Sequence, residues 1–221
     1  TGALNDETLR NLHERLLYLR NLEEKKEQVI NAITEQDKMT DDLKKKILSA
    51  ETLVAVDDLY RPYRPKKQTR ATKAKEKGLE PLANILLLQT TSKSMDEEAQ
   101  SFVDEAKGVA NVKEALAGAK DIIAEMIADK ADYRKSIRNC TMKQGRLVVK
   151  AKDEKAESVY EMYYDFSEEL SKITGYRVLA INRGEKEKFL TVKVEAPDAQ
   201  IVNALNKTMI KDNPNTKTLM E

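Results

Sequence analysis

The feature that most constrains this chain is a run of leucines near its N-terminus. Residues 6–36 contain neither proline nor glycine, and they hold leucines at spacings of three and four residues: Leu9, Leu12, Leu16 and Leu19. This spacing is the period of an amphipathic α-helix. At about 1.5 Å per residue such a helix spans on the order of 45 Å, which is longer than a small domain is wide. We therefore expect a long spine helix against which later helices pack.

The chain continues with a helical pattern as far as residue 144. Charged residues make up 35% of it and aromatic residues only 5%, a composition typical of long solvated helices with aliphatic seams. Thr40 can cap a second helix with its hydroxyl. A third helix must end near Tyr60, because Pro62 and Pro65 follow and the residue before a proline is pushed out of helical geometry. The segment 61–67 is therefore predicted to be an exposed, extended connector.

At Gly145 the period of the sequence changes. Three segments have β-branched or alternating side chains and predict strands: residues 147–149, 176–181 and 189–194. The last two are predicted to pair as a β-hairpin over residues 176–194. Helices are expected between and after these strands, at residues 155–164, 168–173 and 198–210.

The predicted fold is mostly α with a small antiparallel β-sheet in the C-terminal half. It is multi-helical and elongated, with the long N-terminal helix as its spine. Two subdomains are expected within this length. Residues 1–144 form a helical subdomain that carries a basic loop at 61–77, and residues 145–221 form an α+β subdomain with the hairpin.

Several functions are disfavoured by what the sequence lacks. Cys140 is the single cysteine and His13 the single histidine, so no pair of metal ligands occurs at ligand spacing. The glycines match neither a phosphate-binding loop nor a dinucleotide fingerprint, and no nucleophile or carboxylate has the partners that catalysis needs. No apolar run approaches the roughly 18 residues of a membrane span. We expect a cytoplasmic protein that is not an enzyme and binds no cofactor, metal ion or membrane.

The main candidate for a binding site is the basic segment, residues 61–77. It carries eight cations against one acid, Glu76, so its net charge is +7 in a chain whose total is +1. A proline-stiffened cationic loop with an interleaved tyrosine could follow a phosphate backbone while the ring stacks on a base. The candidate nucleic-acid-binding residues are Arg61, Tyr63, Arg64, Lys66, Lys67, Arg70 and Lys73.

The alternative is that these cations form a solvated face or pair with acids elsewhere in the chain. Cations that point to solvent would support a direct contact with a polyanion. Cations folded inward against carboxylates of the same molecule would leave the segment only an architectural role.

A second basic window, residues 134–152, has seven cations and no acid, and an acidic window, residues 153–169, follows it with seven acids and one lysine. We expect the two windows to neutralise each other across neighbouring elements. The aromatic residues Tyr160, Tyr163, Tyr164 and Phe166 could stack on bases. At these spacings, an aromatic wedge that joins helix to sheet is the favoured interpretation.

The chain resembles a known family in several segments. These are Leu-Tyr-Arg-Pro-Tyr-Arg-Pro-Lys-Lys at 59–67, Lys-Gly-Leu-Glu-Pro-Leu-Ala at 77–83, Gly-Ala-Lys-Asp-Ile-Ile-Ala-Glu at 118–125 and Tyr-Arg-Val-Leu-Ala-Ile-Asn-Arg-Gly-Glu at 176–185. They resemble the Tex family of bacterial transcription accessory proteins. That family combines an N-terminal helical region, a ribonuclease-H-like domain, helix-hairpin-helix modules and a C-terminal oligonucleotide-binding barrel that binds RNA.

The resemblance implies that this chain is the helical region alone, a non-catalytic fragment that binds nucleic acid or supports its binding. RNA or single-stranded DNA would be the partner, mainly through domains absent from the chain, and the transcription machinery would be a further partner. The alternative is an interaction scaffold that positions other domains or a polymerase partner without touching nucleic acid.

Overall fold

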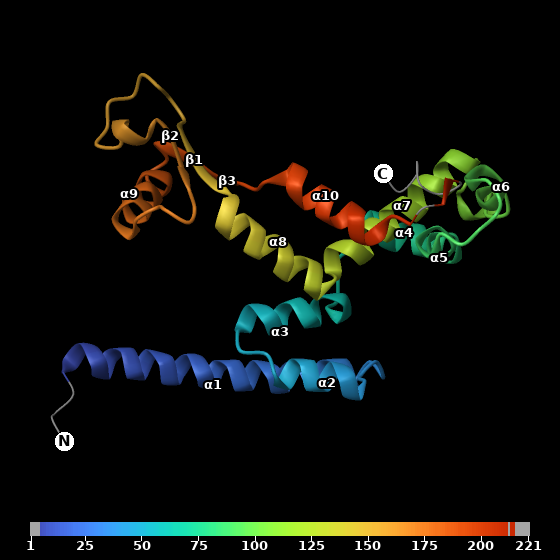
Figure 1. The fold of residues 1–221 in the computed structure, drawn as a ribbon, viewed down its shortest axis with the longest axis horizontal. Coiled ribbons are helices and arrows are strands. Elements are labelled where there is room, and N and C mark those ends of the chain that lie inside the picture. Colours follow the sequence, from blue (N-terminus) through green and yellow to red (C-terminus); the bar gives the residue numbers. More distant parts are fainter. Residues whose placement is uncertain (1–4, 212, 215–221) are drawn as a thin grey trace. The chain divides into compact units, whose positions relative to one another are not determined.

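The structure is a computed structural model that describes residues 5–211, 213 and 214. The expected fold class is confirmed, because the chain is mostly helical and has a three-stranded antiparallel sheet in its C-terminal half (Figure 1). Two compact units are distinguished by their internal contacts. The first contains the described residues up to Arg134 together with Asn213 and Pro214, and the second contains residues 135–211. No helix of the described residues is long and apolar enough to cross a membrane.

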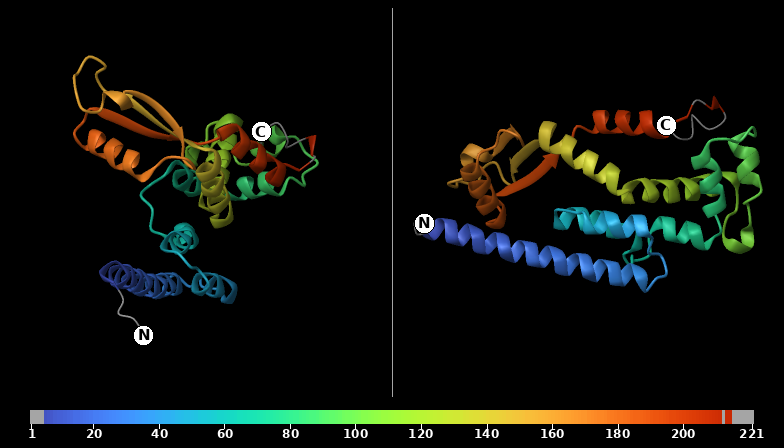
Figure 2. Two further views of the ribbon diagram at one scale, coloured as in Figure 1. Left: turned by 60° about the vertical axis from the view of Figure 1, so that its left-hand side comes forward. Right: turned by 60° about the horizontal axis from the view of Figure 1, so that its bottom comes forward.

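The long N-terminal helix is confirmed as α1, Asp6–Thr34. Asn5 caps it, since its side-chain oxygen accepts a hydrogen bond from the backbone N–H of Thr8 at 2.8 Å. Two shorter helices, α2 (Asp41–Leu48) and α3 (Leu53–Tyr60), lie beside its C-terminal half (Figure 2). The three helices share a buried core of Leu22, Val29, Ile33, Ile47 and Val56. Only the C-terminal half of α1 acts as the expected spine here, because the leucines of its N-terminal half are exposed.

The rest of the first unit is organised around α7, Val112–Asp129. Against it pack α4 (Arg70–Glu76), α5 (Glu80–Leu88) and α6 (Met95–Gln100). Short 3₁₀ turns occur at Arg61–Tyr63 and Glu105–Lys107. Gly118 of α7 allows α4 and α5 to approach closely, because a Cβ there would lie 2.4 Å from Cδ1 of Leu79 and 3.3 Å from Cβ of Ala74.

A further helix, α8 (Ala131–Gln144), ends where the sequence predicts the change of period, and β1 (Arg146–Ala151) begins directly after Gly145. The sheet has the order β2-β1-β3 and is antiparallel throughout, with β2 at Asp165–Glu169 and β3 at Leu190–Glu195. Two helices follow these strands in the chain, α9 (Gly175–Lys186) after β2 and α10 (Asp198–Met209) after β3.

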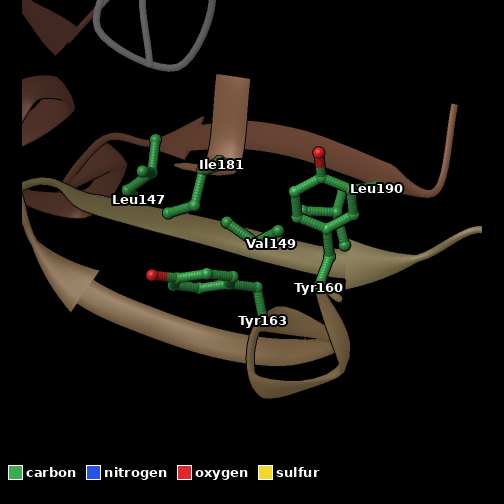
Figure 3. Close-up of a cluster of buried hydrophobic side chains, with 6 residues drawn as sticks. All are labelled: Leu147, Val149, Tyr160, Tyr163, Ile181 and Leu190. Carbon is green, nitrogen blue, oxygen red and sulfur yellow. The ribbon is translucent and has the colours of Figure 1, made fainter. Parts of the chain in front are cut away.

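The core of the second unit lies on one face of this sheet (Figure 3). It is built from Leu147, Val149, Tyr160, Tyr163, Ile181 and Leu190. Tyr164 and Phe166 pack against this core, and the ring of Phe166 meets that of Tyr163 edge-on at a centroid distance of 5.4 Å. The aromatic cluster is therefore a packing wedge, as its spacing predicted.

The predicted β-hairpin over 176–194 is wrong. Residues 175–186 form α9, and only the second expected strand exists, as β3. Ile181 and Gly184 are buried three residues apart, and Ala180 and Ile181 pack into the core on the sheet, a helical spacing that the β-branched composition concealed. Gly184 permits this close packing, because a Cβ there would lie 2.5 Å from Cδ1 of Leu190.

The helices expected at 155–164 and 168–173 are also wrong. The first is a loop with a single 3₁₀ turn, Glu161–Tyr163, since Tyr160 and Tyr163 are both drawn into the sheet core. The second overlaps β2, whose residues have low β-propensity but pair with β1 along its length. In both cases tertiary packing overrides local preference.

Candidate nucleic-acid interface

The basic segment begins where α3 ends at Tyr60. Pro62 lies in a 3₁₀ turn over Arg61–Tyr63, and the chain then runs without regular structure until Thr69 caps α4 by accepting a hydrogen bond from the backbone N–H of Thr72 at 3.0 Å. The turn is fastened to the end of α1, because the amide of Gln36 donates to the carbonyl oxygen of Tyr63 at 3.0 Å. The predicted extended connector is thus extended only after its first turn.

Three carboxylates of α7 lie opposite this segment. Asp121, Glu125 and Asp129 follow one another at spacings of four residues, which places them on one face of the helix. We call these three residues the α7 ladder. Asp129 is buried, and the other two are half-buried.

The segment and the α7 ladder pair in antiparallel order. Nε of Arg61 donates to Oδ1 of Asp129 at 2.9 Å, and the ammonium of Lys66 contacts Oδ2 of Asp129 and, at 3.2 Å, Oε1 of Glu125. Further along, Nη2 of Arg70 lies 3.2 Å from Oδ1 of Asp121. Arg61 and Lys66 are therefore inward cations, and they hold the segment against α7.

Tyr63 and Arg64 lie between Arg61 and Lys66 in the chain. The guanidinium of Arg64 sits 5.8 Å from the ring centroid of Tyr60 and 3.8 Å from Oδ1 of Asp57, and its side chain is exposed. The ring of Tyr63 packs against the core of α1, α2 and α3 and is half-buried. A base could reach only part of its surface.

The remaining cations face solvent along α4. Lys67, Arg70 and Lys73 are exposed, and the side chain of Arg70 is 86% exposed despite its contact with Asp121. Lys77 continues this side of the helix four residues after Lys73 and donates to the carbonyl oxygen of Gly108 at 2.7 Å. Ala71 and Ala74 of the same helix are buried. We call Lys67, Arg70, Lys73 and Lys77 the α4 row.

Two surface hollows, of about 560 and 350 Å³, open beside the basic segment. Both are lined by Arg64 and Lys66, but also by Glu125 and Asp129. Each hollow has four cations and these two carboxylates in its lining, and the carboxylates lower the positive charge that a phosphate would meet there. In the α4 row, by contrast, only Arg70 has a carboxylate beside it, that of Asp121.

The second basic window pairs only partly as expected. Arg146 of β1 donates to Oγ of Ser167 at 2.9 Å, and its charge adds to the hydrogen bond from Lys172 that lowers the pKa of Glu169. Arg134, by contrast, pairs at 2.7 Å with the buried Asp58, which is not part of the acidic window. Among the described residues, no cluster of three or more His, Cys, Asp or Glu could hold a metal ion.

Two features of this site were missed from the sequence. Lys77 belongs to the α4 row although it was left out of the candidate residues, and its spacing of four from Lys73 is the signal that could have included it. The α7 ladder was visible as three acids at spacings of four. Its pairing with the basic segment could not be inferred without knowing that α4 packs on α7.

Comparison with known proteins decides the family. Residues 90–219 match the family described as Tex central region-like, which is more than half of the chain. The protein YdcI of Bacillus subtilis is 44% identical over 215 residues, covering 96% of this chain and 30% of that protein. The transcriptional accessory protein Tex of Neisseria gonorrhoeae is 37% identical over 198 residues, covering 88% of this chain and 26% of that protein. The chain belongs to the Tex family.

A human relative, S1 RNA-binding domain-containing protein 1, is 31% identical over 205 residues, covering 88% of this chain and 20% of that protein. The chain thus spans less than a third of the length of these Tex-type relatives. The part that matches the Tex central region includes the α7 ladder, whereas the basic segment lies before it.

Proposed function

We propose that this chain is a non-catalytic module of a cytoplasmic Tex-type transcription accessory protein, and that the α4 row contacts the phosphates of single-stranded nucleic acid, RNA in the first instance. The proposal is carried by the exposure of Lys67, Arg70 and Lys73 in a segment where Arg61 and Lys66 are held by Asp129 and Glu125 of the α7 ladder. The relatives named for transcription and for RNA binding support the choice of partner.

The α4 row has a suitable geometry for a phosphate backbone. Arg70 and Lys77 lie seven residues apart on one side of the helix, a rise of about 10 Å along the axis, so the row can reach more than one phosphate. Arg70 gives up little to do so, because its exposed ion pair with Asp121 contributes little stability. Its guanidinium can exchange a carboxylate for a phosphate of the same charge sign.

A second candidate function is that of a pure scaffold, and the inward cations favour it. Arg61 and Lys66 join the end of α3 to the last turns of α7 through the buried Asp129. A segment used only in this way would position other domains or a polymerase partner without touching nucleic acid.

Binding of a fluorescently labelled single-stranded RNA, followed by anisotropy over a series of salt concentrations, separates the two candidates. Three phosphate contacts predict that affinity falls about 20-fold between ~50 and ~200 mM salt. The variant Lys67→Glu/Arg70→Glu/Lys73→Glu is expected to lose this binding. A control with the same change of charge, Lys38→Glu/Lys44→Glu/Lys45→Glu, reverses exposed lysines that precede or lie on α2 and is expected to retain most of it.

Equal losses in both triple variants would mean that only net charge matters, and the α4 row would no longer be the site. Absence of binding by the wild-type chain at low salt would leave the scaffold as the function. Incubation of the RNA with the chain and Mg²⁺ or Mn²⁺ tests the non-catalytic part, since we expect the RNA to remain intact.

A further inference from the structure

The N-terminal half of α1 exposes a stripe of leucines. The exposed fractions are 47% for Leu9, 58% for Leu12, 44% for Leu16 and 40% for Leu19. Their spacing of three, four and three residues is that of alternating a and d positions of a heptad. A contiguous row of exposed leucines on a soluble helix marks an interaction surface.

The stripe is continuous with a packed interface in the same helix. Beyond Leu19 the buried apolar residues of α1 are Leu22, Val29 and Ile33, which pack with α2 and α3; Leu22 and Val29 are g positions in the register of the stripe, so this buried side adjoins the stripe. The first half of α1 therefore also carries an apolar surface, and its leucines are exposed in the part of the chain that the structure describes, whereas the apolar residues of the second half are buried. A helix laid along the first half would extend a packing arrangement that the protein already uses.

The residues that flank the stripe identify the chemistry of its occupant. With the leucines at a and d, the e and g positions from Asp6 to Arg20 are Asp6, Thr8, His13, Arg15 and Arg20; the one acid lies at the N-terminal end, and the charged e and g residues beside Leu12, Leu16 and Leu19 are Arg15 and Arg20. The next carboxylate along the stripe, Glu23, is already engaged by the ammonium of Lys26 at 2.8 Å. Side chains at e and g select the partner of a coiled coil through their charges.

A second copy of this chain fits poorly. A parallel pair would bring Arg15 of one copy toward Arg20 of the other, and like charges at these positions oppose pairing. An antiparallel pair would set Arg20 toward His13 and Arg15 toward Thr8, so neither arginine would gain a carboxylate partner. A helix with carboxylates at e and g would instead form an ion pair at each basic position.

We propose that the N-terminal half of α1 is a docking surface for an amphipathic helix of a partner protein, and that this helix buries aliphatic side chains on Leu9, Leu12, Leu16 and Leu19 while its acidic flanks pair with Arg15 and Arg20. The surface is independent of the α4 row and of nucleic-acid binding.

The probe for this proposal is a synthetic peptide of about three heptads with leucine at a and d and glutamate at e and g, whose own copies repel one another. A matched peptide carries lysine at e and g. Fluorescence anisotropy measures the binding of each to the chain. We expect the glutamate peptide to bind about tenfold more tightly than the lysine peptide, and Arg15→Glu/Arg20→Glu to reverse this order.

A matched pair of variants tests the stripe itself. Leu16 and Leu17 are equally exposed, at 44% each, but Leu17 lies at a b position outside the stripe. Leu16→Asn is expected to weaken binding of the glutamate peptide about tenfold or more, and Leu17→Asn to leave it unchanged. Both positions are at the surface, so both variants should keep the helical circular dichroism of the parent.

Two results would overturn the proposal. Failure of the glutamate peptide to bind, or equal binding of the two peptides, would show that the flanking charges select nothing. The second result would come from sedimentation velocity of the chain alone. A dimer that is abolished by Leu16→Asn and kept by Leu17→Asn would assign the surface to a second copy of the chain.

Discussion

Replacement of Asp129 by alanine is the sharpest test of how the basic segment is held. The carboxylate is buried at the end of α7. One of its oxygens accepts a hydrogen bond from Arg61, and the other forms an ion pair with Lys66. Removing one partner of a fully buried ion pair costs about 3–5 kcal/mol, mostly because the other charge remains buried. Here the cations can return to water, since the side chain of Arg61 is 46% exposed and that of Lys66 is 27% exposed. Glu125 also remains to hold Lys66. We therefore expect Asp129→Ala to lower the free energy of unfolding by about 2 kcal/mol.

Urea unfolding followed by circular dichroism measures this loss, and Lys66→Met completes a double-mutant cycle. The two substitutions should show a coupling of about 1 kcal/mol, the range of residues that share one ion-pair network. RNA binding provides the second readout. Because Asp129→Ala removes a negative charge and leaves the α4 row intact, affinity should stay equal or rise slightly. Loss of RNA binding with unchanged stability would refute the division into inward and outward cations.

Three further predictions concern packing. Gly118→Ala should lower Tm, because the new Cβ would lie 2.4 Å from Cδ1 of the buried Leu79. The cost of such overpacking, about 1–3 kcal/mol, exceeds the gain in helix propensity of about 1 kcal/mol. A raised Tm would show that the helices can separate freely to make room for the methyl group. Gly184→Ala should be destabilising by a similar amount and should weaken the near-ultraviolet circular dichroism of the tyrosines, because the ring of Tyr160 lies 3.1 Å from the new atom. Lys26 is buried and donates to the carbonyl oxygen of Leu48 at 2.9 Å. In urea unfolding, Lys26→Met, which keeps the apolar stem, should change the free energy of unfolding by no more than about 1 kcal/mol. Lys26→Ala should lower it by about 2 kcal/mol.

Most of the helical half could be predicted because its signals are local. The leucine period fixes α1, and Asn5 and Thr40 both cap helices with their side chains, as their residue types predict. The errors lie in the second unit, where packing decides. Residues 176–181 look like a strand by composition, yet they form part of α9, because Ile181 and Gly184 meet the sheet at a helical spacing.

The candidate site was only partly predictable for a similar reason. The excess of cations in residues 61–77 is visible in the sequence, and so is the exposed α4 row once the helical period is applied. Which cations turn inward depends on Asp129, which is 68 residues from Arg61 in the chain. Local sequence contains no information about that pairing.

The α7 ladder also sets an upper limit on what the basic segment can do with a polyanion. Its three carboxylates face Arg61, Lys66 and Arg70, while Asp57 and Glu80 lie close to Arg64 and Lys75. Within the described residues, Lys67, Lys73 and Lys77 are the cations of the segment that form no ion pair. Since Arg70 can exchange its partner, the segment can neutralise about three or four phosphates, for which the salt dependence on a single strand has a log–log slope of about −2 to −3. A slope near −5 would require Arg61 and Lys66 to leave Asp129 and join the cations that contact phosphate.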